Sequence, residues 1–225
     1  MDGRGASGRG SRLERARVEL LLTAERLFAT LGLDNVSLRQ IASEAGYANP
    51  ATIQYHFGSK QGLYRAIVEY RTPGIDRRHA ELLDEVCEID AYGVAEVIAR
   101  PLLEMGPTVH YAGFLGQLLV NFGKFPGIAD ALLSGDGSRR LLAAVDGLLP
   151  DISPGVRALR LQFATLLLVH AIANRRAGTD ASPAGRLTEP QLEDELLAAM
   201  AAVLQPPGDH VVDPVGAGAR IRGNR

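Results

Sequence analysis

Residues 36–60 read VSLRQIASEAGYANPATIQYHFGSK. Ser37 is a good N-cap, and Gln40 stands three residues later, where its amide can reach back to the cap. Gly46 suits the left-handed backbone conformation that ends a helix, because glycine adopts it without steric cost. The stretch therefore predicts a short helix, a tight turn, a second short helix and the start of a third. This pattern is typical of a helix-turn-helix unit.

The second short helix is predicted to begin at Asn49 and Pro50. Asn accepts hydrogen bonds from the first free N–H groups of a helix, and Pro suits its first position. Ile53 and Phe57 are four residues apart, so both must point inward. The side chains left on or near the outer surface are Ala51, Thr52, Gln54, Tyr55 and His56. A small polar helix of this kind fits the major groove of DNA, where Gln can pair with adenine and Thr or Ala can touch a thymine methyl group.

Lys60 gives a further indication of nucleic-acid binding. It follows Ser59 at the predicted N-terminus of the third helix, which runs to about Arg71, and a cation there opposes the helix dipole. A bound phosphate removes that conflict, because free N–H groups, the dipole and the ammonium group then converge on one anion. A solvated surface lysine is the alternative. The predicted DNA-binding residues are Ser37, Arg39, Asn49, Ala51, Thr52, Gln54, Tyr55, His56 and Lys60.

Residues 12–71 resemble the N-terminal domain of the TetR/AcrR family of bacterial transcriptional regulators. The motifs that carry the resemblance are Phe28-Ala29-Thr30-Leu31-Gly32, residues 36–42, Glu44-Ala45-Gly46, residues 55–60 and Leu63. The resemblance implies that Tyr55, His56 and Lys60 touch phosphates and that Phe57 belongs to the core. This chain carries one residue more than the commonest family pattern between Gly46 and Tyr55, which predicts a reshaped turn.

The predicted fold is all-α. A three-helix, homeodomain-like helix-turn-helix domain is followed by a helical domain for ligand binding and dimerisation, and strand signals are nearly absent. Beyond Leu63, periodicity predicts helices over residues 76–88, 94–105, 109–122, 127–134, 138–148, 154–177 and 189–204. The predicted boundaries are a disordered basic arm over 1–11, a DNA-binding domain over 12–62, an effector-binding and dimerisation domain over 63–205 and a disordered tail over 206–225.

Charge is distributed unevenly along the chain. The whole chain carries a net charge of -2, but residues 1–60 hold eight basic and six acidic side chains, whereas the remainder holds 16 basic and 20 acidic ones. Five arginines fall within the first 17 residues, in a Gly/Ser-rich arm that cannot fold alone. The arm either reaches DNA, in the minor groove or along the backbone, or is a solvated tail.

Composition favours a cytoplasmic protein. No uninterrupted apolar run approaches about 18 residues, the length that spans a bilayer, and residues 1–11 lack the apolar segment of a secretory signal. The single cysteine, Cys87, excludes an internal disulfide. Either Cys87 is a passive helix residue or it forms an intermolecular redox bond.

The last two helices predict a homodimer. Apolar side chains surround the helix at about 154–177 on nearly all sides, so it needs cover from its own domain and from something else. The helix at 189–204 has a stripe with small residues, made of Leu192, Leu196, Ala199, Met200 and Val203. Together these helices predict a symmetric four-helix interface, and the family resemblance implies the same arrangement. The alternative is that both are monomer core.

A ligand pocket is predicted around residues 110–122. His110, Phe114, Gln117 and Asn121 fall on one helical stripe that mixes an aromatic ring with hydrogen-bonding groups, as small-molecule cavities do. Phe163 and His170 are added as further ligand-binding candidates. The alternatives are a partly exposed amphipathic face and, for His170, a buried interface histidine.

The predicted function is a ligand-responsive transcriptional repressor. A homodimer binds a palindromic operator and is released by a small, largely apolar effector. One rival is a helical DNA-binding protein without an effector, of architectural or recombinase type. An enzyme is the other rival, but the sequence has no glycine-rich phosphate loop, no paired zinc histidines and no Gly-x-Ser-x-Gly elbow. No cofactor, catalytic residue, metal site or membrane partner is expected.

Overall fold

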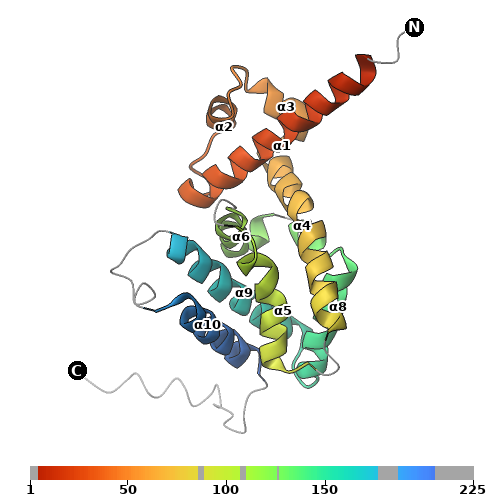
Figure 1. Ribbon diagram of the computed structural model, residues 1–225, viewed down its shortest axis with the longest axis vertical. Helices are drawn as coiled ribbons and strands as arrows, with labels where there is room; N and C mark the ends of the chain where they lie inside the picture. Colours follow the sequence, from red (N-terminus) through yellow and green to blue (C-terminus); the bar gives the residue numbers. More distant parts are fainter. Residues whose placement is uncertain (1–4, 86–88, 107–109, 126, 177–186, 206–225) are drawn as a thin grey trace, which may run out of the picture.

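The computed structural model describes residues 5–85, 89–106, 110–125, 127–176 and 187–205. Within these ranges the chain forms helices and no strand, which confirms the predicted all-α fold. The elements are α1 (Gly5–Leu31), α2 (Leu38–Glu44), α3 (Ala51–Phe57), α4 (Lys60–Asp84), α5 (Ala91–Leu103), α6 (Tyr111–Val120), a 3-10 turn (Phe122–Lys124), α7 (Ile128–Leu132), α8 (Asp136–Leu148), α9 (Pro154–Arg176) and α10 (Glu189–Leu204). Figure 1 shows α1, α2 and α3 at one end of the molecule and the remaining helices gathered below them.

The upper end is a small three-helix domain. Helix α1 contributes the buried side chains Leu20, Leu27 and Phe28, which meet Ile41 of α2 and Ile53 of α3 in one hydrophobic core. Leu13 and Leu31, which flank this buried stretch of α1, are exposed.

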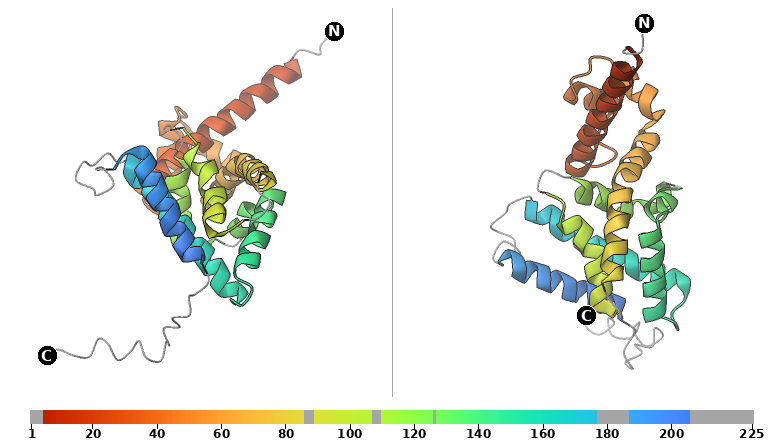
Figure 2. Two further views of the ribbon diagram at one scale, coloured as in Figure 1. Left: turned by 60° about the horizontal axis from the view of Figure 1, so that its bottom comes forward. Right: turned by 45° about the vertical axis from the view of Figure 1, so that its right-hand side comes forward.

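Helix α4 joins this domain to the helical body. It runs from beside α3 down the side of the body (Figure 2), where it packs on α5, α7 and α8. The sequence predicts two helices here: one ends near Arg71 and the next begins at Asp76. Pro73, which lacks a backbone donor, lies between them. That prediction is wrong, since one continuous helix contains Pro73. Packing along its length outweighs the single missing hydrogen bond.

Helix α6 lies directly against α1. A methyl group built on Gly113 would come within 3.1 Å of the Cβ atom of Ala29, so glycine allows the two helices to approach this closely. At the same junction the rings of Phe28 and Phe114 have centroids 6.1 Å apart, and the Tyr64 hydroxyl donates to the Leu33 carbonyl at 3.2 Å. The two parts of the molecule are thus packed together by apolar and aromatic groups.

The start of α8 is anchored on α4 by a carboxylate. The Asp76 side chain accepts the Ser138 N–H at 2.7 Å, and any side chain on Gly137 would overlap the Asp76 carbonyl. Burial opposes ionisation of Asp76, but hydrogen bonds from Ser138 and Gly137 outweigh it and lower the pKa of Asp76. The neighbouring His79 is buried, and burial lowers its pKa to about 4 against the opposing charge of Asp76.

Two terminal predictions need comment. The sequence predicts a disordered arm over residues 1–11, but α1 begins at Gly5. Extending a helix that is already anchored by packing costs far less than nucleating one, and this explains how a Gly/Ser-rich stretch can continue it. The predicted tail over 206–225 and Cys87 lie outside the described residues.

Candidate DNA-binding interface

The helix-turn-helix is held together by local hydrogen bonds. The Ser37 hydroxyl accepts the Gln40 N–H at 3.1 Å, as its N-cap role predicts. Gly46 has a φ of 80°, and the Tyr47 N–H returns to the Ala42 carbonyl at 2.8 Å, which closes the end of α2. The turn into α3 then occupies residues 45–50.

Two inward-pointing side chains and one capping hydrogen bond hold helix α3 in place. The Asn49 side chain accepts the Ala51 N–H at 2.9 Å, and the regular helix begins at Ala51, one residue later than predicted. Ile53 is fully buried, and Phe57 is partly buried, with the Arg17 guanidinium 5.6 Å from its ring centroid. The predicted inward orientation of Ile53 and Phe57 is confirmed.

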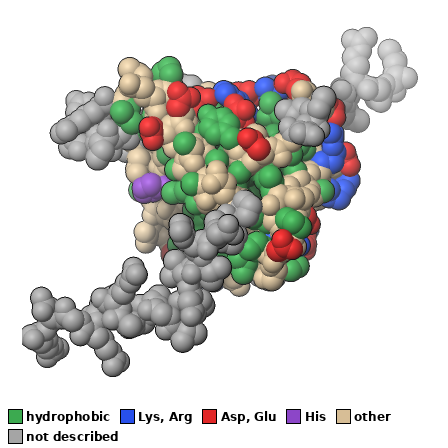
Figure 3. Space-filling model, turned by 90° about the horizontal axis from the view of Figure 1, so that it is seen from below, with side chains coloured by type: hydrophobic (Ala, Val, Ile, Leu, Met, Phe, Trp, Pro, Cys, Tyr) green, Lys and Arg blue, Asp and Glu red, His purple; other side chains and the backbone are tan. Residues whose placement is uncertain are grey.

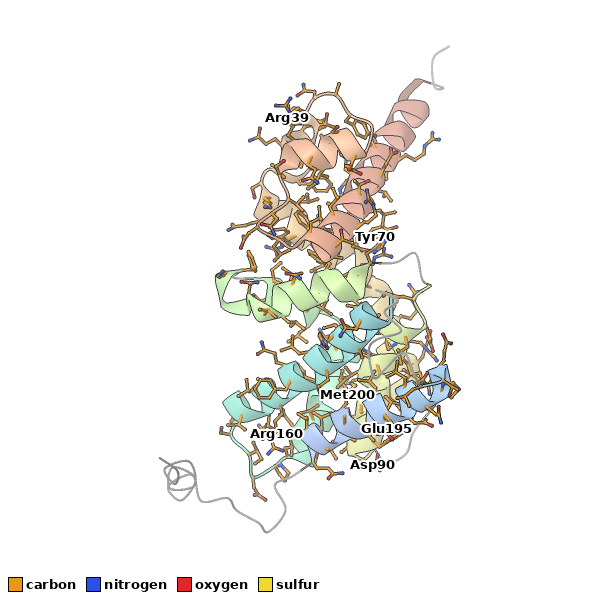
Figure 4. The ribbon with its side chains drawn as sticks, turned by 90° about the vertical axis from the view of Figure 1, so that its left-hand side faces the viewer. Arg39, Tyr70, Asp90, Arg160, Glu195 and Met200 are labelled. Carbon is orange, nitrogen blue, oxygen red and sulfur yellow. The ribbon has the colours of Figure 1, made fainter. Side chains whose placement is uncertain are left out.

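The opposite flank of α3 is open. Gln54 and Tyr55 are exposed, Tyr55 to 75%, while Thr52 and His56 are partly buried. The exposed set among the predicted DNA-binding residues is Ser37, Arg39, Asn49, Ala51, Gln54 and Tyr55. Figure 4 labels Arg39, which lies at the end of the molecule farthest from the helical body. All six of these side chains are therefore accessible to solvent.

Lys60 stands at the first position of α4. The Ser59 hydroxyl caps that helix by accepting the Gly62 N–H at 3.0 Å. The Lys60 ammonium lies 5.7 Å from the centroid of the Phe28 ring, and burial lowers its pKa against the opposing charge of Asp34. The ammonium group thus lies over an aromatic ring, and the phosphate contact of Lys60 stays a prediction.

A buried ion pair at the base of this domain was missed by the sequence reasoning. Glu25 of α1 is 2% exposed, and its carboxylate accepts hydrogen bonds from the Arg71 guanidinium at 2.7 and 3.0 Å and from the His110 backbone N–H at 3.1 Å. The available signal was a charged residue between the apolar positions Leu21 and Phe28, on the buried side of the helix.

The six predicted ligand-binding residues do not meet around one cavity. Phe114 is fully buried in the junction with α1 and α4, while Gln117 lies beside Gly32 at the same junction. His110 directly precedes α6, and Asn121 directly follows it. Phe163 and His170 are exposed on α9, where His170 pairs with Asn174. Tertiary packing separates the four candidates in or next to α6 from the two candidates on α9. The helical stripe on α6 could not reveal this.

A groove of about 440 Å³ lies elsewhere, between α5, α8 and α10. Its lining residues are Asp90, Ala91, Tyr92, Leu148, Ala198, Ala201 and Gln205. Figure 3 views the molecule from below and shows hydrophobic side chains with acidic ones among them at this end. None of the predicted ligand-binding residues lines this groove. Among the described residues, no group of His, Cys, Asp or Glu side chains could hold a metal ion.

Helix α9 buries one side and leaves the other open. Ala164, Leu168 and Ile172 belong to the core of the body, whereas a stripe on the opposite side is exposed. We call this stripe the α9 apolar face; it consists of Val156, Leu159, Phe163 and Leu167. On α10, the predicted interface residues Leu196 and Met200 are buried, while Ala199 is exposed and Leu192 and Val203 are partly buried.

Among the described helices, α9 alone is long and apolar enough to cross a membrane, by length and composition only, over Pro154–Asn174. Only 22% of its most apolar window of 18 residues is buried. Arg157 and Arg160 are the two arginines in this stretch. Arg157 donates to the Leu149 and Ile152 carbonyls after α8, and Arg160 donates to the Val203 and Gln205 carbonyls at the end of α10.

Residues 20–67, which hold the C-terminal part of α1, all of α2 and α3 and the start of α4, match the family of bacterial regulatory proteins named tetR. This match lies on the part of the chain that holds the helix-turn-helix. The match confirms the predicted resemblance to the TetR family at the helix-turn-helix that the local hydrogen bonds define. Proteins of this family are transcription regulators rather than enzymes.

The chain is also similar to individual proteins over longer stretches. It is 32% identical over 116 residues to the HTH-type transcriptional dual regulator CecR of Shigella flexneri, a match that covers 46% of this chain and 51% of CecR. The chain thus spans about half the length of this curated relative. Among solved structures, it is similar to TetR-family regulators from Mesorhizobium loti (20% identity, 86% of this chain and 96% of that one, TM-score 0.48) and from a Rhodococcus species (16%, 85% and 100%, TM-score 0.49).

Proposed function

We propose that this chain is a cytoplasmic transcriptional repressor that binds a palindromic DNA operator as a homodimer and is released by a small, largely apolar effector. The observation that carries the proposal is the open flank of α3. Gln54 and Tyr55 are exposed beside Lys60, and the helix is anchored from behind by Ile53. Hydrogen-bonding side chains on a rigid short helix suit the major groove.

The nine predicted DNA contacts divide by chemistry. Thr52 and Gln54 would face base edges, since Gln pairs with adenine and the Thr methyl group can meet that of thymine. The side chains assigned to the sugar-phosphate backbone are Ser37, Arg39, Tyr55, His56 and Lys60. Asn49 and Ala51 would lie where α3 enters the groove. Backbone contacts set orientation, and base contacts set sequence preference.

The homodimer in this proposal is supported by the α9 apolar face. Four large apolar side chains at helical spacing remain open to solvent in a single subunit, and a contiguous patch of this kind marks an interaction surface. A two-fold axis through α9 and α10 would present two copies of α3 to successive major-groove turns, about 34 Å apart or a multiple of that. A palindromic operator follows from that symmetry.

The effector response is supported by the size of the helical body and by the position of α6. Residues 63–205 exceed what dimerisation alone needs. His110 and Gln117 lie at the two ends of the α6 contact with α1, because the His110 N–H binds Glu25 and the Gln117 side chain lies beside Gly32. A ligand that shifted α6 would therefore act directly on the DNA-binding domain.

The experiment that tests the proposal begins by selecting a duplex from a random pool with the purified full chain. Binding of the selected duplex is then followed by fluorescence anisotropy at several salt concentrations. Lys60→Ala should weaken binding to every sequence and flatten the salt slope by about one unit, while Gln54→Ala should change base preference. Lys124→Ala is the matched control, because Lys124 is exposed on the helical body.

Unchanged affinity, salt slope and sequence preference in both variants would disprove this docking. Failure of the wild-type chain to enrich any duplex would disprove DNA binding altogether. For the effector, a panel of small aromatic and aliphatic compounds is added to the complex. Release of the duplex by at least one compound, with a matching rise in the melting temperature of the free protein, is the expected result. Release by none would favour a DNA binder without an effector.

A further inference from the structure

We propose that Glu25 is a positioning residue that fixes the angle between the DNA-binding domain and the helical body. Through that angle it sets which spacing of operator half-sites the dimer accepts. The inference rests on the proposed function, since it assumes that two copies of α3 bind one duplex. It concerns the junction between the DNA-binding domain and the helical body. None of the residues proposed to touch DNA takes part in it.

The Glu25 carboxylate holds three helices at one point. Its Oε2 atom accepts from Arg71 Nε at 2.7 Å, and Oε1 accepts from Arg71 Nη2 at 3.0 Å and from the His110 backbone nitrogen at 3.1 Å. Glu25 belongs to α1, Arg71 to α4, and His110 directly precedes α6. We call these three hydrogen bonds the Glu25 contact.

Burial shields the Glu25 contact from water and salt. The side chains of Glu25 and Arg71 are only 2% and 17% exposed, so water and salt screen their attraction little. Nearby pairs differ: Arg26 and Glu44 are 43% and 46% exposed, and Arg65 and Glu69 are 59% and 53% exposed. Those two pairs also lie within the upper domain or within one helix, so they do not fix one part of the molecule on the other.

Direction distinguishes the Glu25 contact from the apolar packing around it. The contacts of Phe28 with Phe114 and of Ala29 with Gly113 keep the two parts together, but apolar attraction is non-directional and permits one helix to roll on another. A two-pronged guanidinium-carboxylate pair is planar and directional. With a third hydrogen bond from the start of α6, it allows one orientation of α1 relative to both other helices.

Orientation matters because each subunit supplies one copy of α3. The dimer axis lies in the body, so a change of tilt at the Glu25 contact moves α3 relative to its partner copy. A fixed tilt accepts one separation of half-sites, since inserting a single base pair both lengthens and rotates the site by about one tenth of a helical turn. A variable tilt accepts several separations with similar affinity.

The test measures spacing selectivity with the full chain. Anisotropy gives the affinity for the selected palindrome and for versions with one or two base pairs inserted between the half-sites. Wild type should prefer the original spacing by about tenfold or more, comparable with the effect of one mismatched base pair. Glu25→Gln keeps the side-chain volume but removes the charge, and we expect the preference to fall below about threefold.

Glu69→Gln is the matched control, because it makes the same chemical change in an exposed pair on α4 and should leave selectivity unchanged. Arg71→Lys is the second variant; it keeps the charge, loses the two-pronged geometry and should also reduce selectivity. Circular dichroism and light scattering confirm that each variant is folded and dimeric. If Glu25→Gln does not fold, Arg71→Lys is judged by the same criterion.

The outcomes distinguish failure of the positioning role of Glu25 from failure of the proposed function. A folded Glu25→Gln or Arg71→Lys dimer that discriminates spacing as sharply as wild type overturns the positioning role. A uniform loss of affinity at all spacings, with their ratio unchanged, also overturns it, because a merely structural residue would have that effect. A wild-type chain that enriches no duplex, or is indifferent to spacing, instead disproves the proposed function.

Discussion

The outer faces of α3 and α9 are both open to solvent, but their chemistry differs. On α3 the exposed side chains include Gln54 and Tyr55, which carry hydrogen-bonding groups. The α9 apolar face presents aliphatic side chains and Phe163. Hydrogen-bonding groups suit base edges and phosphates, whereas a contiguous apolar stripe suits another protein surface. Exposure alone therefore does not identify an interface, because the chemistry of the exposed positions decides what can cover it.

The largest expected effect comes from placing a charge on the α9 apolar face. Phe163→Glu should convert the dimer to a folded monomer, because Phe163 is 48% exposed and is not needed for the monomer core. Operator affinity should fall by about 10²–10⁴, the gain that linking two binding modules provides. Light scattering and anisotropy measure the two effects. Leu133→Glu, at an exposed position outside the face, is the control; a dimeric Phe163→Glu would break the comparison.

The next effect concerns the inner side of α3. Ile53→Ala removes a fully buried side chain and should lower the free energy of unfolding by about 2–5 kcal/mol, through lost burial and an unfilled cavity. Urea denaturation followed by circular dichroism measures it. Ala51→Ser, on the outer side, should change stability by less than about 0.5 kcal/mol. Equal losses from both substitutions would show that α3 has no distinct inner and outer sides.

Low pH should destabilise the interior of the helical body, where His79 is buried, rather than the exposed faces of α3 and α9. His79 has a pKa of about 4 when folded and 6.5 when unfolded, so between these values the unfolded chain binds a proton that the folded one does not. Its contribution is fully present above pH 6.5 and is lost as the pH falls to 4, by at most about 3 kcal/mol. Thermal melts of wild type and His79→Leu should show a shallower decline in the variant; parallel curves would contradict this.

The smallest effect is expected from an exposed ion pair. Arg26 and Glu44 are 2.9 Å apart and join α1 to α2, but both side chains are more than two-fifths exposed. Glu44→Gln should therefore cost less than about 1 kcal/mol of unfolding free energy, and less still in 1 M salt. Urea titrations at two salt concentrations provide the measurement. A loss above 2 kcal/mol would mean that surface charge, rather than the buried side of each helix, holds the domain together.

Local signals predicted the DNA-binding end well. Ser37, Gly46 and Ser59 each act within a few residues of their own position, so the caps and the turn could be inferred from sequence spacing alone. The inward placement of Ile53 likewise follows from helix periodicity. Each of these features needs only the geometry of one helix or one turn.

Features that depend on distant contacts could not be predicted. Pro73 looks like a helix boundary in the sequence, but packing against α5, α7 and α8 keeps α4 continuous. Phe114 shares a stripe with polar groups, yet its surroundings come from α1 and α4. Glu25 and Arg71 are 46 positions apart, so no local spacing could pair them.

The unbroken length of α4 has a mechanical consequence. One end carries Lys60 and the other part holds Asp76, which anchors the start of α8. At 1.5 Å per residue, these two positions are separated by about 24 Å along one continuous helix. A rotation of α4 that begins near α8 therefore also moves the Lys60 ammonium group at its N-terminus, because no loop lies between the two positions.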